Sequence, residues 1–278
     1  MTLDLNAYFD RIGYRGAAEP TLDVLRTLVR AHTRTIPFEN LDPLMGRPVD
    51  DLSPEALSDK LVQRRRGGFC YEQNGLMGYV LAEIGFRVRR LTGRVVWTLP
   101  PDAPATAQTH TMLAVTFPGS EGSYLVDVGF GGETPTVPLR MVTGSAQQTP
   151  HEPYRLTDRD DGLVLQAEIQ GEWRPLYEFS TRSVPPADLQ MGSWFVSTHP
   201  SSIFVTGLMA AIVTDEGRVN LAGRDLTVHR AGGSEKMHLP DAAAVVDVLS
   251  GRFGIDVADL GGRAALEAGL GRVLGVDS

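Results

Sequence analysis

The chain has a single cysteine among its 278 residues, so it cannot form a disulfide within itself. It also lacks an apolar run long enough to span a membrane, because the longest one, which starts at Ile203, is interrupted by Thr206 and Gly207. The N-terminal segment carries acidic residues early and has no apolar stretch of the kind that a secretion signal needs. From these absences we expect a cytoplasmic protein that does not bind membranes.

Basic residues are in the minority. The 26 lysines and arginines are outnumbered by 34 aspartates and glutamates, which gives a formal net charge of −8 at pH 7. Such a chain has no general attraction for nucleic acids, so we expect no nucleic-acid partner, and a polyanionic ligand must be held by local donors. His229 and His238 stand apart from the cysteines or carboxylates of a zinc pattern, so we expect no metal.

Hydrophobic residues make up 42% of the chain, which is enough to bury a sizeable core. Residues 1–85 are predicted to be mostly helical. One helix is indicated by the spacing of apolar residues over residues 21–32, another starts at Ser53-Pro54, and a third follows Cys70 and ends near Gly85.

The pattern then changes to short runs rich in Val, Leu, Thr and aromatic residues, from Phe86 to about Phe179. Turn residues separate these runs, as at residues 160–162, and predict an antiparallel sheet or barrel.

The last third mixes both types. A hairpin is predicted with one strand over residues 203–214 and a turn at Asp215-Glu216-Gly217, followed by a strand at residues 225–230 and two helices. This order lacks the regular strand–helix alternation of a doubly wound sheet, so it favours an α+β fold.

The cysteine follows two glycines in Arg66-Gly67-Gly68-Phe69-Cys70 and opens a predicted helix. A nucleophilic sulfur reacts as its thiolate, and the N–H groups and dipole of a helix N-terminus favour that anion. Cys70 is therefore a candidate nucleophile, although a buried core cysteine would give the same local pattern. The arginines at residues 64–66 are predicted to be a solvated helix end.

A cysteine nucleophile needs a base, and the base needs an acceptor that orients it. His110 stands at the start of a predicted strand and Asp127 at the end of another, where side chains can converge on a helix N-terminus. A structural histidine and a turn aspartate remain alternatives, because spacing alone does not show that the three residues meet.

Four segments together resemble the arylamine N-acetyltransferase family: PFENL from Pro37, RGGFCYEQN from Arg66, THTMLAV from Thr109 and DVGFGG from Asp127. The resemblance extends over essentially the whole chain and is thinner after about residue 205. It implies that Cys70 carries the acetyl group, that His110 is the base, and that Asp127 orients and charges the histidine.

The fold that this resemblance implies is α+β and related to the transglutaminase and papain-like architecture. It consists of an N-terminal helical domain, an antiparallel β-barrel domain and a C-terminal α/β lid. We place these at residues 1–85, 86–200 and 201–278, so that the first carries the nucleophile and the second carries the histidine and the aspartate.

The resemblance also implies the reaction. An acetyl group passes from acetyl-CoA, the acyl-donor cosubstrate, to Cys70 and then to the nitrogen of an arylamine or arylhydrazine, in a ping-pong sequence. Such an enzyme would act in xenobiotic metabolism, as a monomer or homodimer, and would need no metal.

Candidate contacts to the acceptor are Phe38, Tyr71, Phe130 and Phe204, because aromatic faces grip a flat ring. Ordinary core packing is the alternative for each of them. Tyr71 departs from the family pattern, which commonly has phenylalanine after the cysteine.

Because the chain is acidic, the phosphates of CoA need local donors. We expect the backbone N–H groups of Gly129 and Gly131 to form an anion-binding nest, Thr206 and Gly207 to offer a second small-residue site, and His229 to reach the nucleotide.

The same residues are compatible with two other functions. A transglutaminase-like or papain-like hydrolase would use Cys70, His110 and Asp127 without forming an acetyl adduct. A binding module that retains only the scaffold would not need the sulfur at all.

Overall fold

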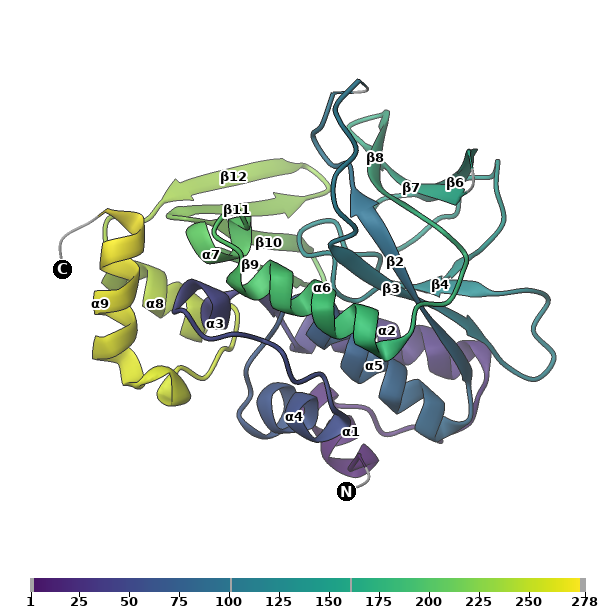
Figure 1. Ribbon diagram of the computed structural model, residues 1–278, viewed down its shortest axis with the longest axis horizontal. Helices are drawn as coiled ribbons and strands as arrows, with labels where there is room; N and C mark the ends of the chain where they lie inside the picture. Colours follow the sequence, from purple (N-terminus) through teal and green to yellow (C-terminus); the bar gives the residue numbers. More distant parts are fainter. Residues whose placement is uncertain (1–2, 101, 161, 276–278) are drawn as a thin grey trace.

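The computed structural model describes residues 3–100, 102–160 and 162–275 (Figure 1), so Asp161 of the predicted turn and the first two residues lie outside it. Its α-helices are α1 (Leu5–Ile12), α2 (Leu22–Thr35), α3 (Leu41–Leu44), α4 (Pro54–Ser58), α5 (Cys70–Ile84), α6 (Pro186–Thr198), α7 (Ile203–Thr206), α8 (Ala242–Gly251) and α9 (Gly262–Leu274). Two further helical turns are η1, a π-helix (Asp59–Gln63), and η2, a 3₁₀-helix (Ala258–Leu260). The strands are β1 (Phe38–Glu39), β2 (Arg87–Val95), β3 (His110–Thr116), β4 (Tyr124–Val126), β5 (Leu139–Arg140), β6 (Tyr154–Arg159), β7 (Gly162–Ile169), β8 (Glu172–Phe179), β9 (Met209–Val213), β10 (Gly217–Ala222), β11 (Asp225–Arg230) and β12 (Gly233–His238).

The N-terminal helices begin and end where the sequence supplies caps. The side chain of Thr21 accepts a hydrogen bond from the N–H of Val24 at the start of α2, and Ser53 accepts one from the N–H of Ala56 at the start of α4. Helix α5 ends before Gly85, whose φ of 103° suits a residue without a side chain. The three helices predicted in this part of the chain are therefore confirmed.

Seven antiparallel strands form one sheet, in the order β5-β4-β3-β2-β8-β7-β6. Isolated bridges from Thr143 to Leu156 and from Gln147 to Tyr154 connect the segment after β5 to β6. The two edges of the sheet thereby meet, and the sheet is a nearly closed barrel. Helix α5 packs against β2 and β3, which brings the helix that carries the cysteine against the strand that begins with the candidate base.

A second antiparallel sheet has the order β1-β9-β10-β11-β12. Its edge strand β1 comes from the first third of the chain, and Phe38 pairs with Ala211 of β9. One face of this sheet packs on α8 and α9 through an apolar cluster that includes Leu226 and Leu249. Figure 1 shows this sheet and the two C-terminal helices on the side of the molecule opposite the barrel.

The prediction of one strand over residues 203–214 is wrong at its start, because its first four residues form helix α7 and the strand begins at Met209. The cause is a long-range contact. The Asn40 amide donates to the carbonyl oxygens of Phe204 and Gly207 and accepts from the N–H of Met209. Hydrogen bonds between residues so far apart in the chain leave no local sequence pattern.

Helix α6 has no counterpart in the sequence prediction, because its apolar residues are not gathered on one face. It buries Leu189 and Val196 while Met191 and Trp194 stay exposed. Across the ranges that the structure describes, no helix combines the length and apolar character needed to cross a membrane.

Candidate active site

Cys70 is the first residue of α5 and is 3% exposed. The turn before it is held by Glu72, whose Oε2 accepts a hydrogen bond from the N–H of Phe69 at 3.1 Å. This carboxylate lies so close to the chain that a Cβ on Gly68 would stand 2.5 Å from it. Only glycine therefore fits at this point of the loop, and the loop delivers the sulfur to the helix N-terminus.

His110 and Asp127 lie at neighbouring ends of the adjacent strands β3 and β4. His110 Nε2 and Asp127 Oδ2 are 2.7 Å apart, and both side chains are buried. The Asp127 Oδ1 atom accepts hydrogen bonds from Asn74 Nδ2 at 2.9 Å and from the Gly129 N–H at 3.0 Å. The carboxylate is thus fixed by three donors.

Charge is strongly stabilised on this pair. Burial disfavours the imidazolium, but the Asp127 carboxylate and Cys70 outweigh burial and raise the pKa of His110 to about 10. Burial also works against the carboxylate, yet His110, Asn74 and the Gly129 N–H hold the pKa of Asp127 below its usual range. The Cys70 sulfur contacts the carbonyl oxygen of Thr109, the residue before His110, at 3.6 Å.

Asn74 is a part of the site that sequence reasoning missed. It lies one helical turn after Cys70 on α5 and is 1% exposed. Besides Asp127, its amide contacts the Thr111 carbonyl oxygen at 2.8 Å and accepts from the Val128 N–H at 3.0 Å. A polar residue four positions after a candidate nucleophile, on the same helix face, was the available signal.

Aromatic rings pack near Cys70 and against His110. Phe204 is close to Phe38 and to Phe69, with ring centroids 6.0 and 5.3 Å apart. Phe130 meets the His110 ring edge-on at 5.2 Å. Sequence reasoning named three of these four rings and missed Phe69.

Tyr71 is buried, and its hydroxyl donates to the Gln108 carbonyl oxygen at 3.4 Å. This contact links the first turn of α5 to the segment just before His110. A role of Tyr71 in acceptor binding stays a prediction.

Several of the predicted CoA donors already make hydrogen bonds within the fold. The Gly129 N–H already donates to Asp127 within the fold, and its part in a CoA-binding nest stays a prediction. The Thr206 hydroxyl donates to Ser202 and the Gly207 N–H to Ile203, so these donors are also taken within the fold.

Gly131 and His229 remain predicted CoA contacts. Gly131 lies against the ring of Phe38, since a Cβ there would stand 3.5 Å from it. His229 is half-buried on β11 and shares a hydrogen bond of 2.7 Å with Ser234. In the described ranges, no three or more His, Cys, Asp or Glu side chains are grouped to hold a metal ion.

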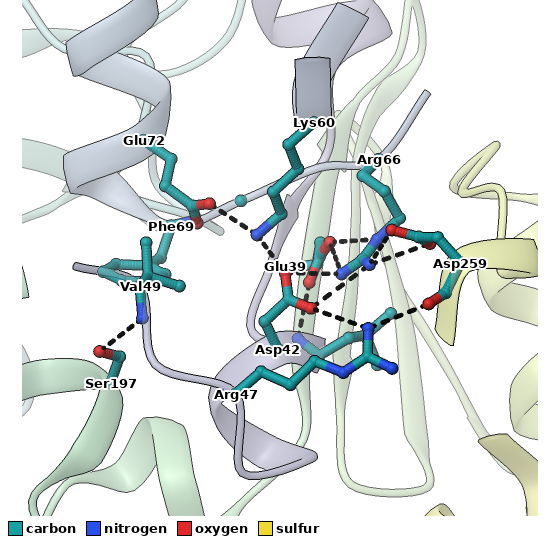
Figure 2. Close-up of polar contacts among 12 residues, drawn as sticks. Glu39, Asp42, Arg47, Val49, Lys60, Arg66, Phe69, Glu72, Ser197 and Asp259 are labelled. Carbon is teal, nitrogen blue, oxygen red and sulfur yellow. Dashed lines mark hydrogen bonds and ion pairs between the residues drawn. The ribbon is translucent and has the colours of Figure 1, made fainter. Parts of the chain in front are cut away.

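A second polar cluster lies behind the cysteine loop (Figure 2). The prediction that residues 64–66 are solvated holds for Arg64 and Arg65, which are exposed, and is wrong for Arg66. Arg66 is 0% exposed and binds Glu39 Oε1 at 2.7 Å and Asp42 Oδ2 at 3.3 Å. It also reaches Asp259 of η2, nearly two hundred residues later in the chain, at 3.3 Å. The prediction of a solvated side chain failed for Arg66 because the carboxylates that bind it are remote in sequence.

A family model of the N-acetyltransferases matches residues 21–260. The arylamine N-acetyltransferase of Mycobacterium tuberculosis is 68% identical, over 99% of this chain and 97% of the relative. That of Mycolicibacterium smegmatis is 59% identical, over 95% and 96%. A solved structure of the Mycobacterium marinum arylamine N-acetyltransferase in complex with CoA has a TM-score of 0.95 and 70% identity, covering 97% of this chain and 99% of that one.

Proposed function

Because the chain belongs to the arylamine N-acetyltransferase family, whose members are acyltransferases, we propose that it moves an acetyl group from acetyl-CoA to arylamines and arylhydrazines through a thioester on Cys70. The observation that supports this most is the charged pair of His110 and Asp127 next to the sulfur, at 2.7 Å from nitrogen to oxygen. It supplies a nucleophile, a base and an orienting carboxylate in one buried site.

In the first step, the imidazolium of His110 stabilises the Cys70 thiolate. Because Nε2 is bonded to Asp127, Nδ1 is the ring nitrogen that remains to exchange a proton with the sulfur. The thiolate attacks the carbonyl carbon of acetyl-CoA, and backbone N–H groups at the start of α5 stabilise the oxyanion. The bond from that carbon to the CoA sulfur then breaks, and CoA leaves with the proton of His110.

In the second step, the acceptor nitrogen attacks the carbonyl carbon of the acetyl-cysteine. His110, now neutral, takes a proton from that nitrogen, and the Cys70 thiolate leaves, which restores the ion pair. An arylamine suits this step because its nitrogen is uncharged near neutral pH. The rings of Phe38, Phe130 and Phe204 would hold its flat ring beside the sulfur.

The register of the second sheet offers a place for the CoA chain. In antiparallel strands, paired residues share a face, so Asn220, Thr227 and Lys236 point to the same side as Phe38. Asn220 abuts Gly132, and its Oδ1 is buried without a hydrogen-bond partner among the described residues. We propose that Asn220 accepts from an amide of CoA and that Lys236 neutralises a phosphate.

We also propose the division of labour expected from the sequence. Residues 1–85 carry the nucleophile, residues 86–200 carry the base and its carboxylate, and residues 201–278 form the lid. The pairing of β1 with β9 ties the first of these parts to the third.

The test is to incubate the protein with acetyl-CoA and to measure its intact mass. A gain of one acetyl group at Cys70, lost when an arylamine is added, is the expected result. Cys70→Ala is the matched control, which should keep CoA binding and form no adduct. Peptide hydrolysis without an adduct would favour the hydrolase instead, and unaltered biological activity of Cys70→Ala would favour the binding module.

A further inference from the structure

Lys60 is a buried lysine that the acetyl-transfer mechanism does not use. It lies on the π-helical turn η1 and is 7% exposed. Its Nζ lies 2.6 Å from Glu72 Oε1 and 2.5 Å from Asp42 Oδ2 (Figure 2). Few lysines are buried to this degree, and those that are need partners of opposite charge.

Glu72 links this lysine to the nucleophile. One of its oxygens faces Lys60, while the other accepts from the N–H of Phe69, the residue before Cys70. Glu72 is also the third residue of α5, so its carboxylate lies in the same helical turn as the sulfur. The order of contacts is thus ammonium, carboxylate, backbone N–H and cysteine.

The surroundings make Lys60 decisive for the charge of Glu72. Burial raises the pKa of Glu72, the Lys60 ammonium opposes that rise, and the carboxylates of Glu39 and Asp42 add to it. Burial also disfavours charge on Lys60, but Glu72, Glu39 and Asp42 outweigh burial and the repulsion of Arg66, so the pKa of Lys60 lies above its usual range. Among Lys60, Glu39 and Asp42, the residue that contacts the Glu72 carboxylate directly is Lys60.

We propose that Lys60 is a positioning residue for Cys70: its buried ammonium keeps Glu72 as the charged cap of α5 and cancels the field of that carboxylate at the sulfur. This inference deepens the proposed function and rests on the role of Cys70 as the nucleophile. An uncompensated carboxylate in the first turn would repel the thiolate that the helix N-terminus otherwise favours.

The experiment follows the alkylation of Cys70 by iodoacetamide against pH. Because Cys70 is the single cysteine, the rate reports one sulfur, whether or not acetyl transfer occurs. Failure of this inference is therefore distinguishable from failure of the proposed function. The key comparison is Lys60→Met against Lys60→Met/Glu72→Gln, since glutamine has the shape of a protonated glutamate, and Lys60→Arg tests rescue by a retained charge.

At acid pH, the single and double variants should be alkylated at the same rate, because Glu72 of the single variant is then neutral. As pH rises and Glu72 loses its proton, the single variant should fall about tenfold below the double variant. Wild type and Lys60→Arg should lack this inflection. Identical profiles of the single and double variants from about pH 5.5 to 9.5 would overturn the proposal.

Thermal unfolding keeps the test decisive if Lys60→Met is recovered only at acid pH. A carboxyl group whose pKa is raised by folding costs stability as pH rises above its unfolded value. The melting temperature of Lys60→Met should therefore fall from about pH 5 to 8 relative to the double variant. Parallel melting curves for the two variants would contradict the role assigned to Lys60.

Discussion

Two buried polar clusters lie on either side of the cysteine loop, and they stabilise charge by different means. The triad cluster, Cys70, His110, Asp127 and Asn74, holds its carboxylate with one imidazolium and two neutral N–H donors. The ion network consists of Glu39, Asp42, Lys60, Arg66, Glu72 and Asp259. In contrast to the triad cluster, it holds its carboxylates with the side chains of a lysine and an arginine.

The difference follows from what each cluster must do. In the proposed reaction His110 loses a proton and regains it during each turnover, so the neutral donors Asn74 and Gly129 N–H must hold the Asp127 carboxylate while the charge of His110 changes. In the ion network no charge needs to move, and full ion pairs can join segments that are distant in the chain. Neutral donors such as Asn74 thus suit the triad cluster, where the charge on His110 changes in the proposed reaction. Ion pairs suit the ion network, where the charges are permanent.

The largest effect on the comparison of the two clusters is expected from Asp127→Asn. This substitution removes the carboxylate charge from the triad cluster and keeps the size and shape of the side chain. The amide would no longer stabilise the imidazolium, and it can hold His110 in the wrong tautomer. We expect kcat/KM for acetyl transfer to fall about 1,000-fold, with the fold retained. Steady-state kinetics with circular dichroism as the control measure this, and a loss of less than about tenfold would contradict the assigned role.

The corresponding change in the ion network is Arg66→Met. It leaves the buried Glu39 without its paired cation and Asp42 paired mainly with Lys60, so the free energy of unfolding should fall by about 3 kcal/mol. Denaturant unfolding measures this. Arg64→Met is the matched control, because the Arg64 side chain is 42% exposed and its pairs should contribute about 0.5 kcal/mol. Equal losses in the two variants would show that burial of the network does not matter.

A smaller effect concerns pH. Because the pKa of His110 is raised from 6.5 to about 10, its charged form contributes stability that is fully present below pH 6.5. That contribution is lost as pH rises through about 10. The stability of the wild type relative to Asp127→Asn should therefore decline over this range. A pH-independent difference between the two proteins would count against the charged pair.

The sequence predicted the parts of the fold that depend on neighbours in the chain. Caps such as Ser53 and the glycine that ends α5 act locally, and these helices were found. Helix α7 was missed because Asn40 holds it from more than 160 residues away. Arg66 was misread for the same reason, since its partners lie on β1, α3 and η2.

The candidate site shows the same division. The motifs named Cys70, His110 and Asp127; in the structure His110 contacts Asp127, and Cys70 contacts the carbonyl oxygen of Thr109 beside His110, while their catalytic roles stay predictions. The CoA donors stay predictions, because a loop's glycine content does not reveal which of its N–H groups are already bonded. The Gly129 N–H, taken by Asp127, is the plainest example.

Gly129 also determines which parts of this enzyme can be redesigned. A Cβ there would stand 2.8 Å from the Cα of Cys70, so the two main chains touch with no side chain between them. An engineer who wishes to widen the range of acceptors gains nothing at this contact, where any larger residue would push the nucleophile aside. The rings proposed to contact the acceptor are better targets; Phe204, for example, belongs to α7, so we expect its exchange to leave the backbone that holds the sulfur in place.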